Sequence, residues 1–199
     1  MGEYRLRCIE GGEIIDDRYA LRCTDHSGLL RAEYDAVRLD TKGHDNVFKF
    51  YDWLPVNSVI RSRSKPIVFK NDKISEKLGL KDLWIAFTGY YPKRGAFVTS
   101  CSFKEMEALP TMARLKEQHG RTIVVASAGN TGRAFAQVSN ETGMPSLIVV
   151  PNTSKDRIRV SEDNGHSKLM TVEGDYADAI SLAERISSMP GFVPEGGAR

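Results

Sequence analysis

The feature that most constrains the fold is a buried strand that runs into a small-residue turn and then a helix. Residues 122–126, TIVVA, form an apolar β-branched run, the pattern of a strand buried on both faces. The turn SAGNTG follows at 127–132, and Ala134, Phe135 and Val138 then mark the buried stripe of a helix. This order directs free backbone N–H groups toward an anion. Alone it is weak evidence, because many α/β proteins carry such a turn and asparagine is an ordinary turn residue.

Strands and helices alternate along the second half of the chain. The pattern predicts helices at 104–118, 131–142, 155–163 and 176–188 and strands at 122–126, 146–150, 168–172 and 191–194. Such alternation predicts an α/β fold of three layers, with a parallel, right-handed βαβ sheet at its centre. Upstream, we expect a short helix at 74–80, a strand at 83–87 and an aromatic, partly alternating segment at 47–53.

A lysine stands near the start of the first long helix. Ser102 and Glu105 have capping-box spacing, which puts Lys104 in the first helical turn. The positive end of the helix dipole repels a cation, and an amine whose protonated form is disfavoured is the better nucleophile toward a carbonyl. Local sequence alone favours a solvated surface lysine. The small-residue turn downstream reverses that preference.

Together the two motifs, SFK at 102–104 and SAGNTG at 127–132, resemble the fold-type II family of pyridoxal-phosphate enzymes, which includes threonine synthase, cysteine synthase and serine dehydratase. The family text is close to T-G-S-F-K-D-R-G-A, whereas residues 99–108 read TSCSFKEMEA, without the Asp-Arg-Gly. That departure, with FYDWLP at 50–55 and GLLRAEY at 28–34, resembles the cysteate synthases, threonine-synthase relatives in the coenzyme M pathway of methanogenic archaea. The resemblance covers the chain from about Tyr4 onward and implies a fold like that of the tryptophan synthase β subunit.

The resemblance also implies a site. Lys104 would bind the aldehyde of pyridoxal 5'-phosphate and later take the substrate α-proton, and Asn130 would hydrogen-bond the cofactor's phenolic oxygen. The loop that would receive the substrate carboxylate consists of Ser127, Ala128, Gly129 and Thr131. The reaction would eliminate phosphate from O-phospho-L-serine and add sulfite to give L-cysteate. The basic residues that are candidates to handle these anions are Arg61, Arg63, Lys65, Lys93, Arg94 and Arg133.

Family members are about twice as long as this chain of 199 residues. We therefore interpret it as an amino-terminal part with an incomplete fold. The implied divisions are a zinc-ribbon-like segment at 1–38, the first part of the large cofactor domain at 39–103, a small mobile βαβ domain at 104–190 and the start of the return to the large domain at 191–199. The family's glycine-rich loop for the cofactor phosphate lies in the other half, so we expect this chain alone to bind the cofactor poorly. The full-length protein would be a homo-oligomer.

The amino-terminal segment contains a reduced set of metal-ligand residues. Residues 8–11, CIEG, and 23–26, CTDH, occupy the places of two C-x-x-C knuckles, as in the zinc-ribbon-like segment of threonine-synthase relatives. A closed zinc site takes four ligands, and Gly11 replaces one of them. The remaining candidates are Cys8, Cys23 and His26. We favour a degenerate ribbon that has lost its metal, although Glu10 or Glu13 could still supply an oxygen.

Charge and composition exclude several classes of function. A net charge of +2 indicates no dedicated nucleic-acid surface. No apolar run approaches the ~20 residues of a membrane helix, so we expect no membrane span. Three widely spaced cysteines make no disulfide framework, and a reducing cytoplasm fits best. We expect Cys101 to serve packing rather than as a nucleophile, because no histidine lies near it in sequence.

Three alternatives stay open on the sequence. One is another enzyme of the same superfamily, namely threonine synthase acting on phosphohomoserine. The second is a non-catalytic pseudo-enzyme fragment that associates with a partner. The third, a generic Rossmann-like nucleotide binder, is disfavoured because the turn at 127–132 lacks the G-x-G-x-x-G spacing.

Overall fold

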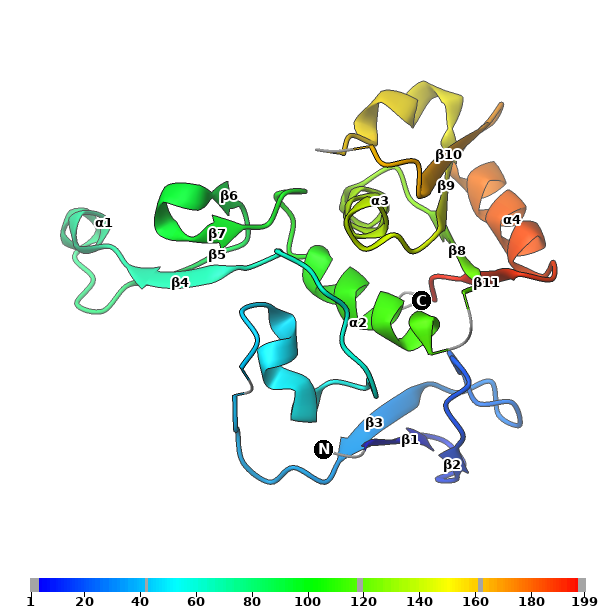
Figure 1. The fold of residues 1–199 in the computed structure, drawn as a ribbon, viewed down its shortest axis with the longest axis horizontal. Coiled ribbons are helices and arrows are strands. Elements are labelled where there is room, and N and C mark those ends of the chain that lie inside the picture. The colour runs from blue at the N-terminus through cyan, green and yellow to red at the C-terminus, as the bar shows by residue number, and fades with distance from the viewer. Residues whose placement is uncertain (1–3, 42, 118–119, 161–162, 197–199) are drawn as a thin grey trace.

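The structure, a computed structural model, describes residues 4–41, 43–117, 120–160 and 163–196. A four-stranded parallel sheet organises the second half of the chain, in the order β10-β9-β8-β11 (Figure 1). Its strands are β8 (Thr122–Ala126), β9 (Ser146–Pro151), β10 (Ser167–Val172) and β11 (Phe192–Pro194). β9 pairs with both β8 and β10, and β11 pairs with the free side of β8. The predicted parallel sheet is confirmed. Residues 192–194 form the last strand of this sheet in chain order, within the run predicted at 191–194, and the predicted domain divisions stay a prediction.

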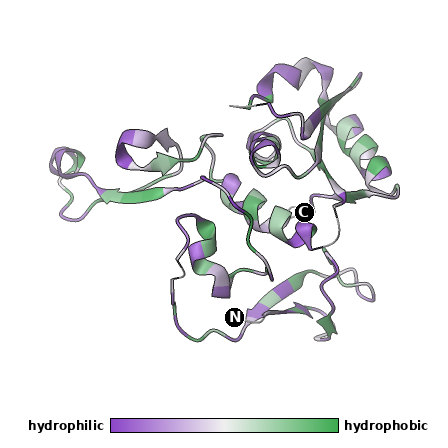
Figure 2. Cartoon of the chain, in the orientation of Figure 1, coloured by the Kyte–Doolittle hydropathy of each residue, from purple (hydrophilic) through white to green (hydrophobic). Residues whose placement is uncertain are grey.

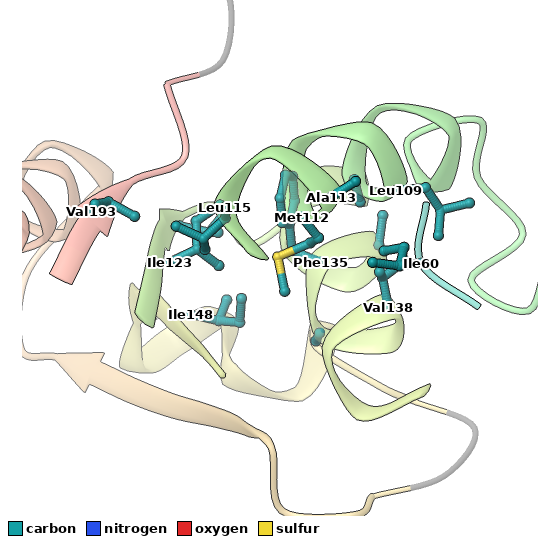
Figure 3. Packing of buried hydrophobic residues seen from close by; sticks show 14 of the residues in the cluster. Ile60, Leu109, Met112, Ala113, Leu115, Ile123, Phe135, Val138, Ile148 and Val193 are labelled. Carbon is teal, nitrogen blue, oxygen red and sulfur yellow. The ribbon is translucent and has the colours of Figure 1, made fainter. Parts of the chain in front are cut away.

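Helices cover both faces of the sheet. On one face lie α2 (Glu105–Lys116) and α3 (Asn130–Thr142), which share a core with Ile123, Val125 and Ile148. On the other, α4 (Tyr176–Ser187) packs on Val124 and Val149, as the alternation of side chains along a strand requires. Figure 3 shows Leu115 of α2 beside Ile123 of β8. The predicted three layers are therefore present.

Two predicted elements take another form. The polar helix predicted at 155–163 is a short 3-10 helix, η3 (Asn152–Arg157), because the NTSKDR segment offers no apolar stripe to bury; residues 161–162 lie outside the described residues. The aromatic segment forms a 3-10 helix, η1 (Val47–Trp53), and buries Phe48 in the main core. The long helix at 104–118 is α2, ending at Lys116, with 118 outside the described residues.

A separate arm precedes α2. β4 (Ile67–Lys70) and β5 (Trp84–Phe87) pair antiparallel and are joined by α1 (Asp72–Leu78), which ends at Gly79 in the left-handed conformation. After β5 the chain forms β6 (Tyr90–Tyr91), the 3-10 helix η2 (Pro92–Arg94) and β7 (Ala96–Phe97), and β6 pairs with β7. Figure 1 shows this arm extending away from the parallel sheet, and Figure 2 shows apolar colouring along β4, where Val68 is exposed.

The amino-terminal segment is a small antiparallel sheet. β1 (Tyr4–Cys8) lies between β2 (Ile14–Ile15) and β3 (Leu30–Tyr34). Asp17 ties this sheet to α2, because its carboxylate accepts bonds from Arg114 at 2.6 and 3.0 Å and from the Tyr4 hydroxyl at 2.6 Å. Tyr19 is buried in the main core. None of the helices in the described ranges combines the length and apolarity needed to cross a bilayer.

Candidate functional site

Lys104 lies at the start of α2, as predicted, but the predicted capping box does not form. Lys104 is itself the N-cap residue, and its backbone N–H donates to Ser102 Oγ at 3.2 Å. The Glu105 side chain does not return to Ser102. It turns inward, where it accepts hydrogen bonds from the backbone N–H of Ser100 and the hydroxyl of Ser64. The Glu105 side chain is buried, and a buried carboxylate without hydrogen bonds is costly. The Ser64 hydroxyl and the Ser100 N–H supply those bonds inside the protein.

Glu105 therefore anchors the loop that carries Lys104. Its side chain is completely buried, and both of its hydrogen bonds are 2.5 Å long. Bonds to a buried charged group contribute about 1.5–3 kcal/mol each, more than bonds between neutral groups. The anchor joins three segments: the irregular stretch at 62–64, the loop at 100–104 and the first turn of α2. Sequence reasoning missed this role, because the same residue satisfied the spacing of a cap.

The loop before Lys104 contains a residue in an unfavourable backbone conformation. Cys101 has φ +54°, in the left-handed region, where a non-glycine residue costs roughly 1–2 kcal/mol. The prediction that Cys101 packs is wrong, because its side chain is exposed. It borders a pocket of about 400 Å³ that lies between this loop and α3. The other lining residues are Arg63, Tyr90, Phe97, Thr99, Gln137 and Glu141.

The turn at 127–132 forms the amino-terminal end of α3. Gly129 is the N-cap in an extended conformation, and its N–H donates to Ser127 Oγ at 3.2 Å. A Cβ at position 132 would come within 2.0 Å of the Ser127 carbonyl oxygen, so the close return of the loop admits only glycine there. Asn130, the first residue of the helix, is exposed. The N–H groups of the first turn have no partners within the helix, so this end suits an anion.

Arg133 joins the two motifs. Its Nη2 donates to the carbonyl oxygen of Ser100 at 2.9 Å, which links the first turn of α3 to the loop that precedes Lys104. Two other polar atoms of the same residues, Arg133 Nε and Ser100 Oγ, are buried and have no hydrogen-bond partner among the described residues. The structure therefore shows a positioning contact for Arg133, and its role as an anion-handling residue stays a prediction. It brings the starts of α2 and α3 together, as the sequence motifs require.

The Lys104 amine is paired with a carboxylate that the sequence did not suggest. Its Nζ contacts Glu107 Oε2, one turn along α2, and about a third of each side chain is exposed. Position 107 is the glycine of the family text, so this acid is a departure from the pattern. A partly exposed ion pair within one helix contributes at most about 1 kcal/mol to stability. The amine can therefore leave Glu107 at little energetic cost and serve as a nucleophile or base.

Comparison with known protein families shows which family contains these two motifs. The family model described as pyridoxal-phosphate dependent enzyme matches residues 70–196, which include Lys104 and the turn at 127–132. The chain belongs to this family. The predicted family, fold class and cofactor class are confirmed, and the generic nucleotide-binder alternative falls away.

Proteins similar to this chain include archaeal ones named cysteate synthase. The chain is 52% identical to that of Methanocorpusculum labreanum, 48% to that of Methanospirillum hungatei and 46% to that of Methanosarcina acetivorans, in each case over its whole length. It spans about half the length of these relatives, 49%, 47% and 49%. A solved diaminopropionate ammonia lyase from Escherichia coli, 18% identical, overlaps 67% of this chain and 38% of its own with a TM-score of 0.47.

The remaining predicted anion-handling residues are scattered over the chain. Arg61 and Arg63 line a second pocket of about 630 Å³ together with Lys116. Lys65 pairs with Asp45 at 3.1 Å. Arg94, next to Lys93 in η2, lies 4.7 Å from the centre of the Phe69 ring. Of the six candidates, Arg63 is the one that also lines the pocket beside Cys101, and which of them handles an anion stays a prediction.

The four polar residues at the end of the amino-terminal sheet lie together. Cys8, Glu13, Cys23 and His26 bring one possible ligand atom each within 4.8 Å of the others. The Cys23 thiol donates to Glu13 Oε1 at 2.8 Å; this bond lowers the pKa of Glu13 to about 2 and raises the pKa of Cys23 to about 11. Of the two acids considered from the sequence, Glu13 joins the cluster. The Glu10 side chain lies against Gly28 instead.

Proposed function

We propose that the complete protein is a cysteate synthase, which replaces the phosphate of O-phospho-L-serine with sulfite and releases L-cysteate. The observation that carries the proposal is the similarity to proteins named cysteate synthase, 52% identity in one case, over the whole length of the chain. Because the chain spans about half of those relatives, the activity is proposed for the complete protein. On the same evidence the protein would act on small anionic substrates in the cytoplasm and as a homo-oligomer.

The residues present fit pyridoxal phosphate. Lys104 offers a partly exposed amine for the cofactor aldehyde, Asn130 an exposed amide for its phenolic oxygen, and the start of α3 a set of N–H donors for the substrate carboxylate. The loop Ser127, Ala128, Gly129 and Thr131 would make that carboxylate contact. When bound, the cofactor supplies an electron sink for the negative charge that develops at the substrate α-carbon.

The chain's own groups then orient the substrate and move one proton. In this proposal the Lys104 amine, released from Glu107, takes the α-proton of phosphoserine, and the loss of phosphate from the β-carbon follows. The Glu105 contacts with Ser64 and Ser100 hold the loop so that the amine keeps its position. Arg63, beside the pocket near Cys101, is the basic residue best placed to attract phosphate or sulfite.

The test uses the complete protein, loaded with cofactor. We expect phosphate release from O-phospho-L-serine and sulfite-dependent formation of L-cysteate, followed by mass spectrometry. Lys104→Ala should lower the rate by at least about 10²–10⁴-fold, the contribution of a positioned acid–base group. The matched control is Lys73→Ala, an exposed lysine on α1, which should leave the rate unchanged.

The alternatives make different predictions in the same assay. Threonine formed from phosphohomoserine, with no reaction of phosphoserine, would assign the protein to threonine synthase. Failure of the complete protein to bind the cofactor would favour the non-catalytic alternative. An unchanged rate in Lys104→Ala would overturn the assignment of the amine.

A further inference from the structure

Two buried thiols, an imidazole and a carboxylate converge at one end of the amino-terminal sheet. Cys8 is the last residue of β1, Glu13 stands just before β2, and Cys23 and His26 belong to the turn that leads toward β3. Both thiols are free and buried, whereas the side chains of His26 and Glu13 keep 43% and 31% of their surface exposed. The cluster is therefore formed at the surface, where an ion can enter it.

We propose that Cys8, Glu13, Cys23 and His26 form a binding site for a divalent metal ion, with zinc as the best match. Two sulfurs, one ring nitrogen and one carboxylate oxygen are all zinc ligands, and four ligands are what a closed structural site requires. Soft thiolates select zinc over magnesium or calcium. The proposal differs from the sequence-based expectation of a ribbon without metal.

The distances fit a tetrahedral ion. His26 Nδ1 lies 3.9 Å from Cys8 Sγ and 3.6 Å from Cys23 Sγ. Zinc bonds of ~2.3 Å to sulfur and ~2.1 Å to nitrogen would hold these atoms roughly 3.6 Å apart. The Glu13 oxygen is closer to its neighbours, at 2.8 Å from Cys23 Sγ and 3.0 Å from His26 Nδ1, because hydrogen bonds join them. A metal would replace the protons of those bonds.

Gly11 explains why the fourth ligand is Glu13. A Cβ built at position 11 would lie 2.0 Å from Glu13 Oε2 and 2.3 Å from His26 Cε1. Position 11 is where the second cysteine of a C-x-x-C knuckle would carry its thiol. The carboxylate and the imidazole thus fill the space that a cysteine side chain at this position would take. The set of ligands is complete with glutamate in place of the missing cysteine.

Backbone contacts hold the ligand loops in place. The Gly11 N–H donates to Cys8 Sγ at 3.3 Å, which fixes the position of that sulfur within its turn. The Cys8 N–H donates to the Glu13 carbonyl at 2.9 Å, and the Cys23 N–H donates to the Gly28 carbonyl at 3.0 Å. Both knuckle turns therefore close on themselves before any ion binds. Such preorganisation lowers the ordering cost of metal binding.

The experiment measures metal uptake by the 199-residue chain purified under reducing conditions. After dialysis against Zn²⁺, mass spectrometry of total metal should find one zinc ion per chain. Loading with Co²⁺ instead should give the visible bands of tetrahedral cobalt and a thiolate charge-transfer band. Glu13→Gln, which keeps volume and hydrogen bonding, should weaken zinc binding by at least about 10- to 100-fold, the loss caused even by outer-shell changes. Its matched control, Glu10→Gln, should bind as the wild type does.

Two further variants keep the test decisive. Cys23→Ser should lose the charge-transfer band, whereas Cys101→Ser, which changes the exposed third cysteine, should retain it. Equal zinc content in wild type and Cys23→Ser would overturn the site. Equal affinity in Glu13→Gln and Glu10→Gln would remove Glu13 from it.

Discussion

The parallel sheet and the amino-terminal sheet are held together in different ways. Around β8 and β9 the buried groups are apolar, and Phe135, Ile123 and Ile148 have no exposed surface. In the amino-terminal sheet the buried residues are few, Leu6 and Cys8 in β1 and the nearby Cys23, and several of the other contacts are polar or ionic. The first region is stabilised by hydrophobic burial, roughly 25 cal/mol per Å². The second depends on a few specific contacts, so single polar substitutions should affect it most.

The largest expected effect is the loss of a core side chain under the parallel sheet. Phe135→Ala should lower the free energy of unfolding by about 3–5 kcal/mol, because it removes a fully buried ring and leaves a cavity between α2, α3 and the sheet. Denaturation by urea, followed by circular dichroism, measures the change. Phe103→Ala is the control, since that ring is 61% exposed, and it should change the stability by less than about 0.5 kcal/mol. Similar losses in the two variants would contradict the packing described here.

The same contrast explains what could be predicted from the sequence. Strands β8, β9 and β10 and helices α3 and α4 lie within a residue or two of their predicted bounds, because apolar periodicity is a local signal. Polar contacts between distant segments carry no such signal. The bond from Ser64 to Glu105 spans 41 residues, and the place of Glu13 beside Cys8 and Cys23 depends on a turn that brings residue 26 back to it. The predicted capping box was wrong for this reason: the Glu105 carboxylate bonds to Ser64 and Ser100, contacts that the local sequence does not reveal.

In the candidate active site, the sequence predicted the functional residues but not the contacts that hold them in place. Lys104 and Asn130 were recognised by motif, and the structure places them at the starts of two helices that pack together. The roles of Glu105 and Arg133 as anchors and the pairing of Lys104 with Glu107 became visible only with the fold. A glutamate that satisfies a helix-start pattern is ambiguous until its burial is known.

A smaller effect is expected at the contact between the two regions. Asp17 and Arg114 form an ion pair whose side chains are only 12% and 15% exposed, and it joins the amino-terminal sheet to α2. Asp17→Asn should lower the free energy of unfolding by about 1.5–3 kcal/mol, the usual loss for a hydrogen bond to a charged group. Asp16→Asn, at an exposed neighbouring position, is the control. If both variants unfold at the same urea concentration, the contact does not couple the two regions.

The subtlest test of this coupling is its dependence on pH. Burial alone would raise the pKa of Asp17, but hydrogen bonds from Arg114 and Tyr4 and the charge of Arg114 outweigh it, so the pKa lies below its ordinary value of 3.8. A carboxyl whose pKa is lowered by folding stabilises the folded state fully above its unfolded pKa. This stabilisation is lost as the pH falls below about 4 through the folded-state pKa.

The wild type should therefore lose stability between pH 5 and 3 more steeply than Asp17→Asn, which has no proton to take up at this position. Urea unfolding repeated across that range gives both slopes, with Asp16→Asn again as the control. Other carboxyls contribute equally to all three proteins, so only the difference between the slopes reports on Asp17. Parallel slopes would mean that the ionised carboxylate adds nothing to the contact, and that shape and apolar packing around Tyr19 hold the amino-terminal sheet to the rest of the chain.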